Sequence, residues 1–202
     1  VIDRYPDDPA ATMIVAQAEV AVELGDWDSA VRLTRSPPGG ASKLQRETLR
    51  LLRARVDEAK GGHAAALEAY ETLAEEGERP VAAAASLRAT LLSLADRKIA
   101  NAQAIERLET LALTWHGGAT EGETLATLGR LYADAGRWRQ VFTIARRANV
   151  VAPNATLTRA LYESAQGLFE DLFLGERASA LGGIEALALY FDFKDFAPAG
   201  RR

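Results

Sequence analysis

The stretch from Thr120 to Pro153 constrains the fold of this chain most, because it has the pattern of two helices joined by a tight turn. Apolar residues recur at helical spacing on both sides of Gly136, and small residues stand where two helices would have to touch. Glycine readily adopts the left-handed conformation that ends many helices, so Gly136 suits the turn. A single hairpin cannot bury its apolar faces alone, and weaker copies of the pattern do recur along the chain.

Three earlier turns repeat this pattern. Gly25, Gly61 and Ile99 take the place of Gly136, and successive turns are 36, 38 and 37 residues apart. Mostly small residues recur seven positions before and five positions after each turn, where the two helices of a hairpin should cross. They are Ala18, Ala54, Leu92 and Gly129 before the turns, and Ala30, Ala66, Ala104 and Val141 after them. Recurrence at this period predicts an α-solenoid, a fold that usually binds and scaffolds.

Helix-capping residues support the same division. Asp26 can cap a helix that begins at Trp27, and Pro80 suits a first helical turn. Two pairs have capping-box spacing, Ser42 with Gln45 and Thr120 with Glu123. The expected helix pairs are 10–24 with 27–36, 41–60 with 63–76, 80–97 with 101–115, 121–135 with 138–151, and 155–174 with 178–191.

Composition agrees with a helical protein and excludes several functions. Of the 202 residues, 48% are hydrophobic and 26% are charged, which allows a sizeable core, and few stretches alternate as strands do. The net charge of −4 argues against a nucleic-acid partner, which requires a basic face. The chain has no cysteine, so disulfides and thiolate metal sites are excluded. No apolar run approaches the roughly 20 residues of a membrane-spanning helix, so we expect no direct membrane insertion by this segment.

Motifs of catalysis and cofactor binding are not found. The paired glycines are not followed by the Lys-Ser/Thr of a phosphate-binding loop, and no serine lies in a nucleophile elbow. His63 and His116 lack a second ligand at helical spacing, so metal binding is not expected. The acidic pairs Asp7/Asp8 and Glu75/Glu76 suit solvated helix ends or loops. We therefore expect no enzyme activity, cofactor or metal.

Residues 122–155 resemble a tetratricopeptide repeat (TPR). The matching positions are Leu125, Leu128, Gly129, Tyr132, Gly136, Trp138, Ala148 and Pro153, whereas Val141 and Ala145 depart from the family pattern. Partial matches in the earlier repeats include Ala18, Gly25, Trp27 and Ala30, then Ala54, Gly61, Ala66 and Tyr70, then Ala104, Leu108 and Leu111. The resemblance implies an all-α, right-handed superhelix of about five antiparallel hairpins. Four TPR-like hairpins would occupy residues 1–154, and a fifth hairpin with a tail would occupy 155–202.

The C-terminal segment is similar to part of a group of long, poorly characterised bacterial TPR proteins. The resemblance rests on Tyr190, Asp192, Phe193, Pro198, Gly200, Arg201 and Arg202, although Phe191 interrupts the pattern. It implies a larger parent protein in the bacterial cell envelope or periplasm, with the cytoplasm as the alternative. The first and last residues, VIDRYPDDPAA and FAPAGRR, look like cuts through a longer repeat array.

In a TPR array, the first helix of each hairpin lines a concave groove that binds a partner. Carried over to this chain, the groove residues are Val15, Glu19, Glu23, Leu51, Arg55, Glu58, Ser93, Asp96, Glu123, Ala126 and Arg130, with Thr12, Ser86, Ala89 and Asp134 beside them. Six of these are acidic and two are arginine, which favours a basic or amphipathic peptide or helix as the partner. The Lys and Asn clamp of chaperone-binding TPRs is replaced by Val15, Glu19, Leu52, Ser86 and Thr90. Alternatively, the groove is merely solvated or is filled by neighbouring repeats of the parent.

Aromatic residues concentrate near the C-terminus, where five of the six phenylalanines lie: Phe169, Phe173, Phe191, Phe193 and Phe196. They could form core, or an exposed patch for self-association. Together these features predict a protein-interaction or scaffolding module. The alternatives are a regulatory or substrate-binding module attached to an enzyme, and a purely structural spacer.

Overall fold

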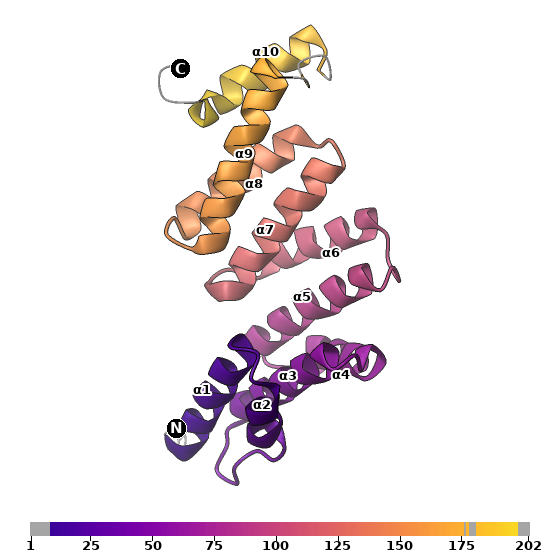
Figure 1. Cartoon of the computed structure of the whole chain (residues 1–202), viewed down its shortest axis with the longest axis vertical. Helices are drawn as coiled ribbons and strands as arrows, with labels where there is room; N and C mark the ends of the chain where they lie inside the picture. The colour runs from indigo at the N-terminus through magenta and orange to yellow at the C-terminus, as the bar shows by residue number, and fades with distance from the viewer. Residues whose placement is uncertain (1–8, 176, 178–180, 198–202) are drawn as a thin grey trace, which may run out of the picture. The chain divides into compact units, whose positions relative to one another are not determined.

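A computed structural model describes residues 9–175, 177 and 181–197, and over these residues the chain forms ten α-helices and no β-strand (Figure 1). The helices are α1 (Pro9–Glu23), α2 (Trp27–Thr34), α3 (Lys43–Ala59), α4 (His63–Glu76), α5 (Arg79–Ala95), α6 (Asn101–Thr114), α7 (Gly118–Asp134), α8 (Trp138–Val151), α9 (Thr156–Leu174) and α10 (Gly183–Phe193), followed by a short 3-10 helix, η2 (Lys194–Phe196). The all-helical prediction is confirmed. Asp7, Asp8, Pro198, Gly200, Arg201 and Arg202 lie outside the described residues.

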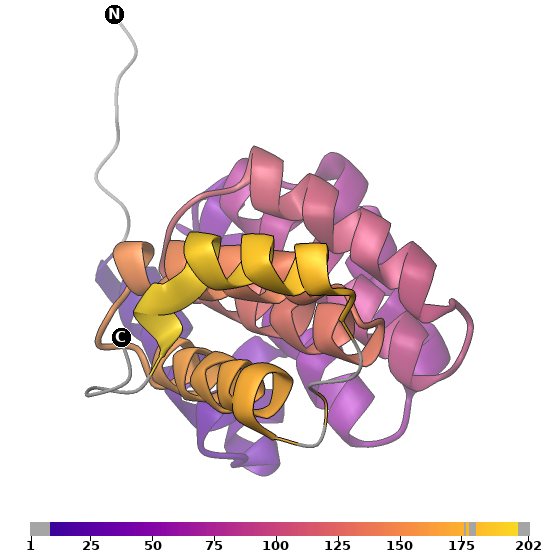
Figure 2. The ribbon, with the colours of Figure 1, turned by 90° about the horizontal axis from the view of Figure 1, so that it is seen from above.

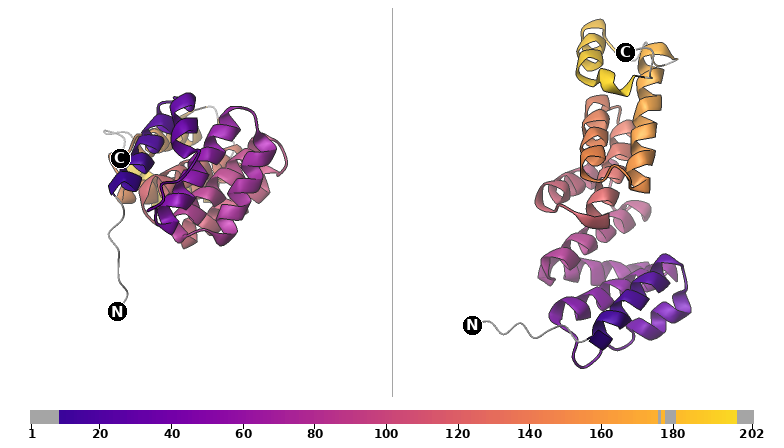
Figure 3. Two further views of the ribbon diagram at one scale, coloured as in Figure 1. Left: turned by 90° about the horizontal axis from the view of Figure 1, so that it is seen from below. Right: turned by 90° about the vertical axis from the view of Figure 1, so that its left-hand side faces the viewer.

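The chain divides into two compact units, residues 1–100 with α1–α5 and residues 101–202 with α6–α10. The boundary lies between α5 and α6, inside the third expected hairpin. Within each unit, helices that follow one another in sequence mostly pack side by side (Figures 1 and 3). Helices one hairpin apart also touch, since α1 contacts α3, α3 contacts α5, and α7 contacts α9.

Three of the four expected turns share one C-cap geometry. Gly25, Gly61 and Gly136 have φ angles of 71°, 84° and 68°. In each case the next residue donates its N–H to a carbonyl five positions earlier, as in a Schellman motif. These hydrogen bonds run from Asp26 to Ala21, from Gly62 to Asp57 and from Arg137 to Tyr132, each at 2.8 Å.

The third turn differs from the expectation. Arg97, not Ile99, has the left-handed conformation, with φ of 57°, and Lys98 donates to the Ser93 carbonyl at 2.8 Å. The motif therefore recurs two residues earlier than the alignment suggested, and the segment before α6 is correspondingly longer. A non-glycine residue rarely adopts this conformation, so the sequence pattern gave no indication of it.

The expected crossing positions are buried. Ala18, Ala30 and Ala66 are fully covered and Ala54 is 2% exposed, so their small side chains let neighbouring helices in the first unit approach closely. Gly129 has a different role from the expected one. A Cβ atom on Gly129 would lie 2.3 Å from Cδ1 of Leu161, so its small size admits α9 rather than α8.

Two of the three predicted side-chain caps are present. The Asp26 carboxylate accepts the Ser29 N–H, and Ser42 with Gln45 forms a full capping box. The expected box of Thr120 with Glu123 is wrong, because α7 begins earlier, at Gly118. The Glu121 carboxylate instead accepts the N–H of Gly117, the residue before α7, at 2.6 Å.

Three of the five C-terminal phenylalanines, Phe169, Phe193 and Phe196, form core, as the first of the two interpretations expected. Phe142 in α8 lies at their centre, with ring centroids 5.8 Å from Phe169, 5.2 Å from Phe193 and 5.3 Å from Phe196. All four are buried, whereas Phe191 is 63% exposed. Figure 2 looks onto the second unit from the side of α10, which is its outermost helix. None of the described helices combines the length and apolar character needed to cross a membrane.

Candidate partner-binding surface

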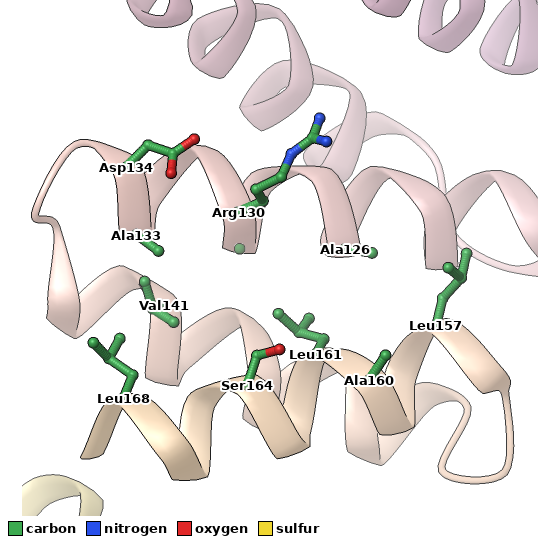
Figure 4. A pocket seen from close by; sticks show the side chains of 11 residues that line it. Ala126, Arg130, Ala133, Asp134, Val141, Leu157, Ala160, Leu161, Ser164 and Leu168 are labelled. Atoms are coloured by element: carbon green, nitrogen blue, oxygen red, sulfur yellow. The ribbon is translucent and has the colours of Figure 1, made fainter. Parts of the chain in front are cut away.

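An open hollow of about 350 Å³ lies between α7 and α9 in the second unit (Figure 4). Helix α7 contributes Ala126, Gly129, Arg130, Ala133 and Asp134, helix α8 contributes Val141, and helix α9 contributes Leu157, Ala160, Leu161, Ser164 and Leu168. The lining positions recur every three or four residues on α7 and on α9, so each helix presents one face to the hollow. The predicted groove residues Ala126 and Arg130 therefore line a real concavity.

The hollow is apolar inside and polar at one edge. Leu161 and Val141 are buried at its base, while Leu157 is 48% exposed and available to a partner. Arg130 and Asp134 are exposed at the edge of the hollow, and their side chains point away from α9 (Figure 4). Their opposite charges make the edge of this hollow balanced rather than acidic.

In the first unit, ion pairs neutralise much of the expected acidic character. Glu23 in α1 pairs with Arg55 in α3 at 2.9 Å, and Glu58 in α3 pairs with Arg88 in α5 at 2.6 Å. These pairs join the first helices of successive hairpins, α1 to α3 and α3 to α5. Predicted groove residues therefore hold neighbouring helices together across the face that was expected to bind a partner. The sequence could not show this, because the partners are separated by 30 or more residues.

Glu58 also accepts a hydrogen bond from the Tyr70 hydroxyl at 2.6 Å. Burial raises the pKa of Tyr70, and the adjacent Glu58 carboxylate raises it further. The second unit repeats the arrangement, since Tyr132 donates to Glu109 at 2.6 Å and its pKa is raised by burial and by that carboxylate. Both tyrosines therefore stay neutral and act as hydrogen-bond donors between helices.

The other predicted groove residues differ in accessibility. Leu51 belongs to the hydrophobic core of the first unit and Ser93 is 3% exposed, so neither presents its side chain to solvent. Val15 and Glu123 are half-buried, and Glu19 is exposed. Whether this set contacts a partner remains a prediction.

Asp96 is engaged with basic side chains. Its carboxylate lies 2.7 Å from Nδ1 of His63 and 3.6 Å from Nζ of Lys98. The hydrogen bond with His63, opposed only in part by burial, lowers the pKa of Asp96. His63 thus has a carboxylate partner that sequence spacing did not indicate. Across the part of the chain that the structure describes, no cluster of three or more His, Cys, Asp or Glu residues could hold a metal ion.

The α9 side of the hollow was missed by the sequence analysis. Groove positions were assigned to the first four hairpins only, although Leu157, Ala160 and Ser164 recur on α9 with the spacing seen on α7. Extending the repeat register into the fifth hairpin could have found them.

Fold and site together define a protein whose described residues are all-helical, with helices that pack in neighbouring pairs and an open apolar hollow between α7 and α9 of the second unit. Comparisons of the chain with protein-family models, curated proteins and solved structures give no significant match.

Proposed function

We propose that this chain is a protein-interaction module that binds an amphipathic helix or peptide in the hollow between α7 and α9. The proposal includes a TPR-like, right-handed solenoid and a larger bacterial parent, as the sequence resemblance implies. The observation that carries it is the hollow, because residues chosen as groove positions from the repeat pattern line an open apolar concavity.

The size and shape of the hollow suit a helix. Its α9 lining runs from Leu157 to Leu168, which is about 16 Å at about 1.5 Å per residue. A partner helix of similar length would place apolar residues at i, i+3 or i+4, and i+7 along this strip. The site lies on two packed helices, so little conformational freedom is lost on binding.

The charges refine the expected partner. The edge carries one arginine and one aspartate, and three predicted groove acids of the first unit, Glu23, Glu58 and Asp96, are paired with arginine, histidine or lysine. Both features favour an amphipathic partner of mixed charge over a strongly basic one.

A display library of amphipathic helical peptides tests the proposal with defined ligands. Peptides selected on the wild-type chain should lose at least about tenfold in affinity, about 1.4 kcal/mol, for Ala160→Trp, which places a bulky side chain in the hollow. Ala160 is exposed, so the substitution should not disturb the core.

Ala102→Trp is the matched control, because Ala102 is also exposed, lies on α6 in the same unit and is not part of the lining. Selected peptides should bind this variant as they bind the wild type. Peptides that bind both variants with wild-type affinity, or a library that yields no binder, would overturn the proposal.

A further inference from the structure

Helix α1 has an apolar face that no described helix covers. Met13 and Val20 in the helix and Leu24 directly after it are 62%, 57% and 78% exposed, and their spacing places them on one side. Ala18 and Val22, which pack into the core of the first unit, lie on the opposite side. The left view of Figure 3 shows α1 and α2 at the outer side of this unit.

This face is hollowed. Met13, Ala16, Val20, Leu24 and, from α2, Leu33 line an open concavity of about 430 Å³, with Gln17, Asp26 and Ser29 among its polar lining residues. The inner side of α1 packs on α3, in the same way that α3 packs on α5 and α7 packs on α9. The hollow is therefore placed where one more helix would continue the same stack.

Helix α10 has the complementary feature, an exposed apolar ridge. Ile184, Leu187 and Phe191 are 90%, 60% and 63% exposed at spacings of three and four residues. Leu189 and Phe193, on the other side of the helix, are buried against the rest of the second unit. Figure 2 shows α10 with one long side turned away from α8 and α9.

We propose that the chain self-associates head to tail, with the α10 ridge of one copy seated in the α1–α2 hollow of a second copy. The ridge and the hollow have the same helical period and both are largely apolar, and Asp26 is the charged residue among those that line the hollow. A contact of ridge with ridge or of hollow with hollow would set two like shapes against each other, whereas the head-to-tail contact pairs a protrusion with a recess.

The contact extends an interface already present in the fold. Helix α1 packs on α3 with its inner side, and the ridge would pack on α1 from the outer side as the next helix of the stack. One helix against one helix pair buries less than the about 800 Å² per partner of a standard interface, so the association should be weak, with Kd in the range of about 10 µM or above. A head-to-tail contact that does not close into a ring adds further copies as concentration rises.

Two single variants distinguish this arrangement from contacts of ridge with ridge or of hollow with hollow. Val20→Glu places a charge in the hollow, and Leu187→Glu places one on the ridge, and both residues are exposed in the isolated chain. Sedimentation velocity over about 1–500 µM should show the mass of the wild type rising with concentration, while each variant alone remains a monomer.

The decisive measurement is an equimolar mixture of the two variants. The Val20→Glu variant keeps an intact ridge, and the Leu187→Glu variant keeps an intact hollow. The mixture should therefore form dimers that join the ridge of the first variant to the hollow of the second, and no larger species. Leu113→Glu, at an exposed apolar residue on α6 outside both faces, should associate like the wild type. Circular dichroism should show that all three variants are folded.

The proposal is overturned if the wild type remains a monomer at all concentrations, as it would if another protein covers these faces. A mixture that remains monomeric also overturns it. A ridge-to-ridge or hollow-to-hollow dimer would appear as association by one of the two single variants, and this too contradicts the head-to-tail contact. The peptide-binding site is separate, so Ala160→Trp should leave self-association unchanged.

Discussion

The ion pair between Glu121 and Arg147 offers a quantitative test of what stabilises the second unit. Glu121 lies in the first turn of α7 and is 2% exposed. Its carboxylate accepts the Gly117 N–H at 2.6 Å and Nη2 of Arg147 at 2.8 Å. Arg147 in turn donates to the Ala112 carbonyl at the end of α6, also at 2.8 Å. One buried carboxylate therefore links α6, α7 and α8.

Glu121→Gln keeps the shape of the side chain and removes its charge. Breaking a buried pair costs about 3–5 kcal/mol, and a hydrogen bond to a charged group contributes about 1.5–3 kcal/mol. The Arg147 side chain is 30% exposed, so water partly solvates the charge left behind. We expect the free energy of unfolding of the second unit to fall by about 2 kcal/mol.

Urea unfolding followed by tryptophan fluorescence measures this change in the free energy of unfolding, provided that the fluorescence reports on the second unit alone. Of the three tryptophans, Trp115 and Trp138 lie in the second unit, so a Trp27→Phe background removes the signal of the first. Trp115 donates its indole N–H to the Gly117 carbonyl at 3.1 Å, which places a probe beside the substituted side chain.

Asp192→Asn is the matched control, because the Arg139–Asp192 pair is in the same unit but its side chains are 51% and 52% exposed. Its loss should cost about 0–1 kcal/mol. If Glu121→Gln destabilises the unit no more than this control does, the buried pair does not stabilise the junction and the reasoning is refuted. A double-mutant cycle with Arg147→Met should give a coupling energy of at least about 1 kcal/mol.

The pH dependence of the same pair has a definite sign. Burial raises the pKa of Glu121, but the hydrogen bonds from Gly117 and Arg147 outweigh this and lower it overall. A carboxyl whose pKa is lower in the folded state stabilises the fold above its unfolded pKa, about 4.3, and loses this contribution as pH falls through the folded pKa. The destabilisation caused by Glu121→Gln should therefore shrink progressively as pH falls below about 4.3, measured as a shrinking difference in urea midpoint from the parent.

Three further substitutions give expected outcomes from unfolding measurements. Arg97→Gly should stabilise the first unit by about 1 kcal/mol, because Arg97 has a φ of 57° that glycine adopts without strain. Tyr70→Phe should cost about 1 kcal/mol through loss of the 2.6 Å hydrogen bond to Glu58, and no loss would show that this bond is not stabilising. Gly129→Ala should lower the free energy of unfolding by about 1–2 kcal/mol, because the added Cβ would lie 2.3 Å from Leu161, and this clash outweighs the helix propensity of alanine. The loss should vanish in a Leu161→Ala background, where the clashing atoms are removed.

The helices could be predicted from sequence because their boundaries depend on local interactions. Ser42 with Gln45 forms a capping box across three residues, and Gly61 ends α3 through its own backbone conformation. Prediction failed where the residues near a helix end allowed more than one place for the helix to end or begin. Arg97 took the conformation expected of glycine, and α7 began at Gly118, ahead of the predicted box.

The candidate site was predictable only in part. The repeat register placed Ala126 and Arg130 on the correct face of α7, because the period of a helix fixes which residues share a face. The depth of the hollow depends on how closely α9 approaches, and that is set by the contact of Gly129 with Leu161, 32 positions apart in sequence.

The sequence by itself determined the helical content, most of the turns and the spacing of small residues at helix contacts, since each is encoded within a few neighbouring positions. Tertiary structure alone decided which charges are free and which apolar faces are covered. Glu58 reads as a groove acid in the sequence, yet it is bound by Tyr70 and Arg88. Phe191 reads as one of five similar aromatics, yet it alone is largely exposed. Pairing and burial depend on residues far apart in the chain, and folding is what brings them together.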